Sequence, residues 1–212
     1  MNFAEYNVKD ANFEEILLAL KSLDTVEAVA LGGSRSTGAS DENSDYDIYV
    51  YCAKIPTAET RENLLGKYCS IAEFGNHYWE SEDNTVMNNG IPVDIIYREI
   101  DRFGRYIDTV IKGGKAFNGY TTAFWHNIKN SKVLFDKTGS FTKFRDMAQI
   151  DFPENLRSAI IKNNRNLLNG KLPSYDRQIK KAQERGDIVS VNHRITAFLE
   201  SYFDVIFALN RQ

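Results

Sequence analysis

The stretch "LGGSRSTGASDENSDYDIYVY", Leu31–Tyr51, decides the fold. It begins at the end of one apolar run, passes through two glycines and a polar spacer, and ends in a second apolar run. A glycine pair followed by polar residues indicates a turn, so the pattern predicts a strand, a tight turn and a second strand. The second strand holds two acidic residues, Asp45 and Asp47, although strands disfavour aspartate.

The acidic residues of this strand predict a metal site. Side chains at positions i and i+2 of a strand lie on one face, so Asp45 and Asp47 point the same way. Two carboxylates held close together repel each other unless a cation lies between them. Hard cations such as Mg²⁺ bind carboxylate oxygens together with phosphate oxygens of a substrate. The alternative is a pair of solvated carboxylates at a sheet edge.

A third carboxylate, Asp94, lies in the apolar run "IPVDIIY". A charge in such a strand costs free energy unless it is paired or coordinates a metal. If this strand lies beside that of Asp45 and Asp47, the three carboxylates form one acidic cluster. A salt bridge from Asp94 to Arg98 or Arg102 is the alternative.

The glycine turn Gly32–Gly33–Ser34 precedes these aspartates. Glycine lets the backbone approach a ligand closely, and the N–H groups of such a turn, with the Ser34 hydroxyl, can bind phosphate oxygens. A turn for phosphates beside carboxylates for Mg²⁺ is what phosphoryl or nucleotidyl transfer requires. It is not a Walker-type loop, because no GK[ST] follows. A plain strand-to-helix turn is the alternative.

Hydrophobic periodicity predicts an α/β region followed by helices. The first helix is expected to contain Phe13 and to be capped by Asn12 with Glu15. Strands are expected over 26–31, 46–51, 77–81 and 91–100, helices over 57–70, 98–112 and 140–149, and a strand or connector over 132–139. A turn near Asn88–Gly90 joins two of the strands.

From Pro153 the pattern becomes purely helical, and an apolar stripe runs from Ile188 to Leu209. The charged stretch between the predicted helices, which contains "KKAQER", is expected to be solvated. We therefore predict two domains: an α/β domain over residues 1–150 and an all-helical domain over residues 151–212.

Composition and charge exclude several classes. The 212 residues are 42% hydrophobic and carry a formal net charge of -3, which does not suit a general nucleic-acid binder. The sequence has no run of about 18 apolar residues, so we expect no transmembrane helix and no membrane partner. We also expect no signal peptide. Cys52 and Cys69 lack metal-ligand spacing, which favours reduced thiols in a cytoplasmic protein.

The motifs resemble a known signature. Gly32-Gly33-Ser34, Ser44-Asp45-Tyr46-Asp47 and Asp94 are similar to the pattern of the DNA polymerase β-like nucleotidyltransferase superfamily: a glycine turn, a short spacer, D-x-[DE] and a distant strand aspartate. The resemblance covers roughly residues 26–97. It implies an α/β (α+β) nucleotidyltransferase fold with a mixed β-sheet flanked by helices. The helical C-terminal half resembles that of aminoglycoside and lincosamide nucleotidyltransferases.

The resemblance implies an enzyme that moves a nucleoside monophosphate, AMP being expected, from an NTP such as ATP to an acceptor hydroxyl, with two Mg²⁺ ions. The residues implied as catalytic and metal-binding are Asp45, Asp47 and Asp94, and those implied as nucleotide-binding are Gly33, Ser34 and Ser44. Ser44 as a plain turn residue is equally open. Glu200 and Asp204 are candidates for a separate base.

The resemblance also implies the acceptor class. A small molecule such as an antibiotic is expected, which would make antibiotic resistance the role; the net acidity favours a small cationic acceptor over tRNA or DNA. By this resemblance the helical domain would close over the acceptor, whereas the aromatic residues of its last helix indicate core or the surface of a homodimer. The alternative is an antitoxin-type or regulatory nucleotidyltransferase that modifies or binds a protein or tRNA partner. A nucleotide-binding protein without transferase activity is the third hypothesis.

Overall fold

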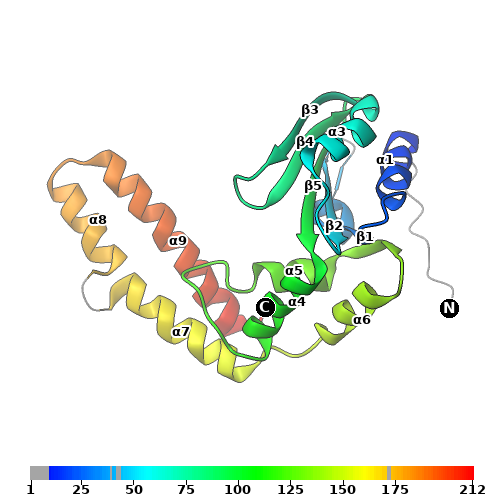
Figure 1. Cartoon of the computed structure of the whole chain (residues 1–212). Coiled ribbons are helices and arrows are strands. Elements are labelled where there is room, and N and C mark those ends of the chain that lie inside the picture. Colours follow the sequence, from blue (N-terminus) through cyan, green and yellow to red (C-terminus); the bar gives the residue numbers. More distant parts are fainter. Residues whose placement is uncertain (1–9, 39, 42–43, 171–172) are drawn as a thin grey trace. The chain divides into compact units, whose positions relative to one another are not determined.

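The structure, a computed structural model, describes residues 10–38, 40–41, 44–170 and 173–212. It contains two compact units (Figure 1). The first comprises the residues up to Gly104 together with Asn127–Met147, and the second comprises Arg105–His126 and Ala148–Gln212. Helices α4 (Ile100–Ile111) and α5 (Ala123–Asn130) each contain residues of both units. The domain boundary at residue 150 stays a prediction.

One mixed sheet of six strands lies in the first unit, in the order β3-β4-β5-β2-β1-β6. The strands are β1 (Val26–Leu31), β2 (Tyr46–Cys52), β3 (Cys69–Asn76), β4 (Ser81–Met87), β5 (Pro92–Glu99) and β6 (Lys132–Asp136). The central strands β2 and β5 pair in parallel, and all other neighbours pair antiparallel. The predicted fold class, a mixed sheet flanked by helices and followed by a helical region, is confirmed.

Helix α1 (Ala11–Lys21) covers one face of this sheet and builds the core with it. Tyr46 of β2 stacks on Phe13 of α1 with ring centroids 4.1 Å apart, and Ile48 and Val50 follow on the same face. The predicted cap of α1 was wrong. Asp10 is the N-cap, because its side chain accepts hydrogen bonds from the backbone N–H groups of Asn12 and Phe13.

The region between β2 and β4 differs from the prediction. The helix expected over 57–70 is the shorter α3 (Ala58–Leu65), followed by a 3₁₀ turn (Gly66–Tyr68) and then β3. The strand expected over 77–81 is wrong, since residues 77–80 connect β3 to β4. β3 is an edge strand with mostly exposed or half-buried residues, so its sequence lacks the apolar alternation of a half-buried strand.

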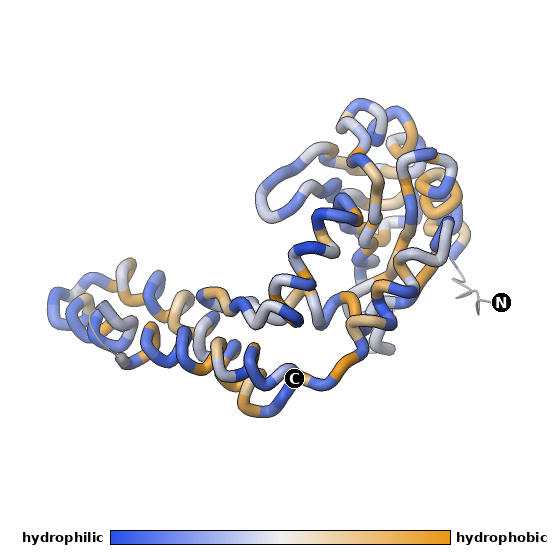
Figure 2. The backbone as a smooth tube through the Cα atoms, turned by 60° about the horizontal axis from the view of Figure 1, so that its bottom comes forward, coloured by the Kyte–Doolittle hydropathy of each residue, from blue (hydrophilic) through white to orange (hydrophobic). Residues whose placement is uncertain are grey.

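Helix α6 (Ser140–Met147) packs on β6 and β1 in the first unit. The second unit contains α7 (Glu154–Asn169), α8 (Tyr175–Glu184) and α9 (Ile188–Asn210), and α7 and α8 both pack on α9. The predicted solvated stretch around "KKAQER" is therefore largely helix α8. Hydrophilic and hydrophobic residues alternate along these helices (Figure 2). Among the described residues, no helix is long and apolar enough to cross a membrane.

Candidate active site

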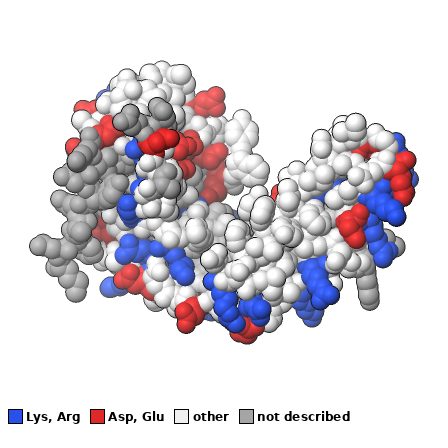
Figure 3. Space-filling view, turned by 180° about the vertical axis from the view of Figure 1, so that it is seen from behind, with Lys and Arg blue, Asp and Glu red and all other residues white. Residues whose placement is uncertain are grey.

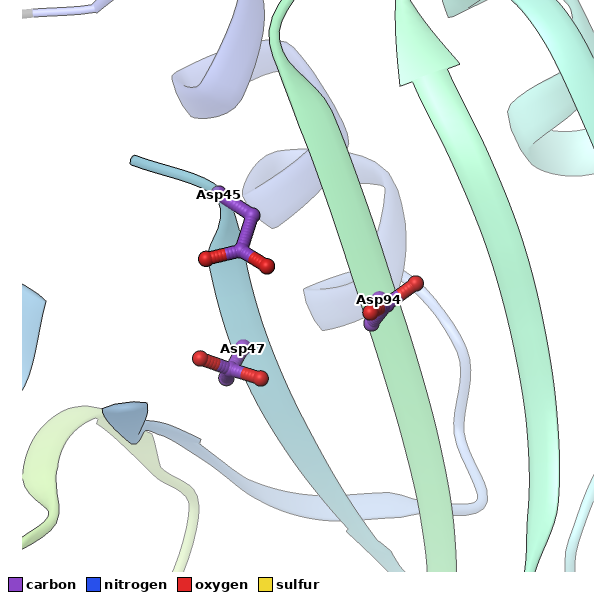
Figure 4. Close-up of side chains that lie close together, drawn as sticks. All are labelled: Asp45, Asp47 and Asp94. Atoms are coloured by element: carbon purple, nitrogen blue, oxygen red, sulfur yellow. The ribbon is translucent and has the colours of Figure 1, made fainter. Parts of the chain in front are cut away.

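The sheet brings the three predicted aspartates together (Figure 4). Asp47 on β2 is the direct register partner of Asp94 on β5. Asp45 comes immediately before β2, which begins at Tyr46, so Asp45 lies at the strand end and not inside the strand as predicted. One carboxylate oxygen from each of the three lies within 4.8 Å of the others. The predicted adjacency of the two strands is therefore correct.

The three carboxylates form an unfavourable arrangement of negative charge. Burial raises the pKa of Asp47, and the charges of Asp45 and Asp94 raise it further. A cation between the carboxylates would remove this repulsion. Three carboxylate oxygens at such distances are the donor set that a hard divalent cation such as Mg²⁺ binds, so the residues present fit this metal.

The glycine turn packs directly against Asp47. The Gly32 N–H donates a hydrogen bond to the Asp47 carbonyl oxygen at 2.8 Å. Gly33, the first residue of the short helix α2 (Gly33–Thr37), has φ +59°, and a Cβ placed there would overlap Asp47 Oδ2. Only glycine therefore fits between the turn and this carboxylate. Ser34 follows in the same helix and is half-buried.

The polar loop before β2 is held by its own contacts. Arg35 Nε donates to the carbonyl oxygens of Ser44 at 2.9 Å and Asp45 at 3.0 Å, and its guanidinium lies 4.0 Å from the ring centroid of Tyr46. The Ser44 hydroxyl donates to Asp41 Oδ1 at 3.0 Å and accepts from the Asp41 N–H at 2.9 Å. These contacts fix the backbone that carries Asp45. A direct role of Ser44 toward a nucleotide stays a prediction.

A residue that sequence reasoning missed orients Asp94. Asn84 of β4 is the register partner of Asp94, and its Nδ2 donates to Asp94 Oδ1 at 2.9 Å. The Asn84 Oδ1 in turn accepts from Asn76 Nδ2 of β3 at 2.7 Å. This chain of amides crosses three strands and fixes the plane of the Asp94 carboxylate. The sequence signal for this role is the polar residue Asn84 within β4. It points to Asp94 only when the register between β4 and β5 is known.

Arg98 forms its salt bridge with Glu80 and not with Asp94, the partner considered from the sequence. Arg98 is buried and donates from Nε to Glu80 Oε2 at 2.8 Å and from Nη2 to Glu80 Oε1 at 2.6 Å. Its guanidinium also stacks over the rings of Tyr49 and Phe103. The pair therefore ties the β3–β4 connection to the sheet.

The helical candidates have structural contacts of their own. Asp204 is buried, and its carboxylate accepts from the Thr121 N–H at 3.0 Å, the Thr121 hydroxyl at 2.6 Å and Asn164 Nδ2 at 3.3 Å. Asn163 and Asn164 both donate to the Phe117 carbonyl oxygen. These bonds join Asp204 to distant residues of its own unit, and its role as a base stays a prediction.

One surface hollow lies on α7. It has a volume of about 540 Å³ and is lined by residues that include Lys162, Arg165 and Asn166. On the face shown in Figure 3, Lys and Arg side chains gather over the helices of the second unit. None of the predicted site residues lines this hollow.

Two families match the chain. Residues 13–116 match the nucleotidyltransferase domain family, and residues 122–212 match a domain of unknown function, DUF4037. No curated protein sequence matches the chain.

Two solved structures are similar in part. The first, a toxin-antitoxin with AMP-PNP, shares 16% sequence identity over 73% of this chain and 94% of that chain, with a TM-score of 0.39. The second, a nucleotidyltransferase-like protein from Exiguobacterium sibiricum 255-15, shares 9% identity over 94% of this chain and 57% of that chain, with a TM-score of 0.43. The chain therefore matches little more than half the length of the second protein.

The fold, the acidic cluster and the family match define the class. Residues 13–116 are a nucleotidyltransferase domain, which supports a nucleotidyltransferase enzyme. The glycine turn, the paired aspartates and the distant strand aspartate are those of the DNA polymerase β-like superfamily, as the motifs predicted.

Proposed function

We propose that the chain transfers AMP from ATP to a hydroxyl group of a small-molecule acceptor, in a reaction that depends on Mg²⁺. The observation that carries this proposal is the acidic cluster of Asp45, Asp47 and Asp94, with ligand oxygens within 4.8 Å of one another beside a glycine turn. Such a cluster serves phosphoryl transfer because charge develops on phosphate oxygens during the reaction.

The three aspartates would hold Mg²⁺, two ions being proposed. When bound, Mg²⁺ stabilises charge on the phosphate oxygens and lowers the pKa of a hydroxyl. Burial raises the pKa of Asp47, and the charges of Asp45 and Asp94 raise it further; a cation would relieve that repulsion, which supports this assignment.

The other residues would bind, orient and accept a proton. The turn of Gly33 and Ser34 would bind the triphosphate, with Ser44 holding the loop that carries Asp45. Because Asn84 donates a hydrogen bond to Asp94 Oδ1, the other oxygen, Asp94 Oδ2, would accept the proton of the acceptor hydroxyl. The acceptor oxygen bonds to the α-phosphorus, the bond to the bridging oxygen breaks, and pyrophosphate leaves.

The acceptor is proposed to be cationic, as an amine-bearing antibiotic is. Glu82 lies on the same face of the sheet as Asn84, and burial, then the charges of Asp94 and Glu80, raise its pKa. This acidic environment, with the net charge of -3, favours an ammonium group over a phosphate backbone. The free thiols Cys52 and Cys69 and the donor ATP fit the cytoplasm as the place of this reaction.

The test is transfer of radiolabel. The protein is incubated with Mg²⁺ and ATP labelled at the α- or γ-phosphate, together with aminoglycosides, lincosamides, tRNA or protein extract. The expected result is transfer of the α-label, and not the γ-label, to a small amine-bearing molecule. Label on tRNA or protein would favour the regulatory alternative, and transfer of the γ-label would contradict nucleotidyl transfer.

A further inference from the structure

Helix α9 buries small and polar residues and leaves several of its large apolar side chains exposed. The buried residues of α9 are Ser201, Asp204 and Ala208, whereas Leu199 is 42% exposed and Phe203 is 49% exposed. An amphipathic helix of a globular protein normally buries its apolar stripe. Val191, Phe198 and Val205 are half-buried on the packed side, but part of the apolar surface of α9 is exposed.

Polar contacts of Asp204 fix the orientation of α9. Asp204 binds the backbone and hydroxyl of Thr121 and the amide of Asn164, all within the second unit. Rotating the helix would remove the acceptor of the Thr121 N–H, which costs roughly 1–3 kcal/mol for a buried group, and would break one hydrogen bond of Asn164. The apolar stripe consequently stays outside, where another surface can cover it.

The exposed apolar side chains of α9, here called the stripe, differ between its two halves, and the exposed polar residues Asn192 and Thr196 lie among them in the N-terminal half. The N-terminal half presents aliphatic side chains, with Ile188 72%, Val189 81% and Ile195 40% exposed. The C-terminal half presents aromatic ones, with Tyr202 41% and Phe207 44% exposed. Neighbouring rings touch along this half, at centroid distances of 5.8–6.2 Å. The branched aliphatic side chains of the N-terminal half can therefore pack against the flat aromatic rings of the C-terminal half of another α9 helix.

The stripe carries no charge. The charged residues of α9 are Arg194, Glu200 and Asp204, and at 3.6 residues per turn all three lie away from the line through Ile188, Ile195 and Leu199. A partner with a charged surface would therefore find no counterpart here. A second copy of the same stripe meets no repulsion.

We propose that α9 pairs with α9 of a second copy of the chain, antiparallel and crossing near Leu199. A two-fold interface needs a self-complementary surface, and antiparallel pairing puts each aliphatic half against the aromatic half of the other copy. The exposed apolar side chains offer on the order of 700 Å² per copy, close to the roughly 800 Å² per partner of a stable interface. Antiparallel helix dipoles also attract each other. This inference is independent of the proposed function.

The experiment measures the mass of the full chain in solution by light scattering and sedimentation. The unmodified chain is expected to be a dimer at micromolar concentration. Leu199→Glu and Phe203→Glu are expected to weaken the dimer at least tenfold, because each buries a charge in an apolar interface. His193→Glu, an exposed position of α9 off the stripe, is the matched control and should leave the dimer intact.

The direction of the pairing is tested by cysteine cross-linking. Leu199→Cys should form an intermolecular disulfide on oxidation, because only residues at the two-fold axis come within the roughly 4.4–6.8 Å between Cα atoms that a disulfide requires. Ile188→Cys should not, and the native chain gives the background from Cys52 and Cys69. A monomeric chain would overturn the proposal, and so would a dimer that Leu199→Glu leaves unchanged. Cross-linking at both positions would overturn the antiparallel arrangement.

Discussion

Asp47 and Asp94 are direct partners in the parallel pairing of β2 and β5, so two carboxylates from distant parts of the sequence stand side by side on one face of the sheet. Asp45 completes the cluster from the end of the same strand as Asp47. No fold gains stability from three carboxylates placed this way without a cation. Under the proposed function, this cluster lowers the stability of the metal-free chain and would bind metal and nucleotide.

The first prediction concerns Asp47→Asn. We expect transfer to fall by roughly 10²–10³-fold or more, because a neutral amide binds Mg²⁺ poorly. The melting temperature without metal should stay the same or rise, since the substitution removes repulsion from Asp45 and Asp94. Asp101→Asn, an exposed position, is the control. Undiminished turnover would sink the assignment of Asp47.

The second prediction is a pH dependence of stability in metal-free protein. The pKa of Asp47 is higher in the folded than in the unfolded chain, so the folded state binds the proton more tightly. Its contribution to stability is therefore lost as pH rises from the ordinary value near 4 through the raised folded-state pKa. Thermal unfolding with chelator should show this loss in the unmodified chain and a smaller loss in Asp47→Asn. Equal pH profiles would contradict the stated environment of Asp47.

The third prediction compares two glycines. Gly33 and Gly38 both have positive φ, but only at Gly33 would a Cβ overlap Asp47, whereas Gly38 has open space around it. Alanine at either position should cost about 1–2 kcal/mol of stability through backbone strain. Only Gly33→Ala should also displace the carboxylate and abolish Mg²⁺-dependent transfer. Equal loss of activity in both variants would show that Gly33 matters only for the backbone conformation of the turn and not for the position of Asp47.

The fourth prediction concerns Asn84→Ala. Removing a group that orients a metal ligand typically costs 10–100-fold, so we expect activity to fall by about that factor and the Mg²⁺ concentration for half-maximal activity to rise. Asn76→Ala should have a smaller effect that vanishes in the Asn84→Ala background, because it acts through Asn84. Asn88→Ala, in the exposed loop after β4, is the control. Additive effects of the two variants would refute the chain of amides.

The fifth prediction separates structure from catalysis at Asp204. Asp204→Ala leaves the buried Thr121 N–H without an acceptor and removes one hydrogen bond each from the Thr121 hydroxyl and Asn164, so the free energy of unfolding should fall by about 3 kcal/mol. The folded variant should retain its turnover number at low temperature. A large fall in the turnover number of a fully folded variant would support a role of Asp204 as a base.

The central strands and the acidic cluster could be predicted because their signals are local. Alternation places Asp45 and Asp47 on one face, and the isolated charge of Asp94 marks its own strand. Asn84 could not be predicted, because its contact with Asp94 depends on the register of β4, and the exposed edge strand β3 was not predicted. A one-residue change of register would have moved Asn84 to the other face.

The helical half shows a different limit of the sequence. The period of the stripe in α9 predicts the helix correctly, but the period reports only which side is apolar. Which side packs on α7 and α8 depends on the buried bonds of Asp204 with Thr121 and Asn164, which join residues far apart in the chain. Long-range polar contacts of this kind leave no periodic signal.

The most direct test of the acidic cluster is the binding of a non-hydrolysable ATP analogue by isothermal titration calorimetry, with and without Mg²⁺. Binding is predicted to be at least tenfold tighter with Mg²⁺ in the unmodified chain. In Asp47→Asn and in Asp94→Asn, the gain from Mg²⁺ is predicted to vanish. An affinity that is the same with and without Mg²⁺, or a gain that survives in both variants, would contradict a metal and nucleotide site at these aspartates.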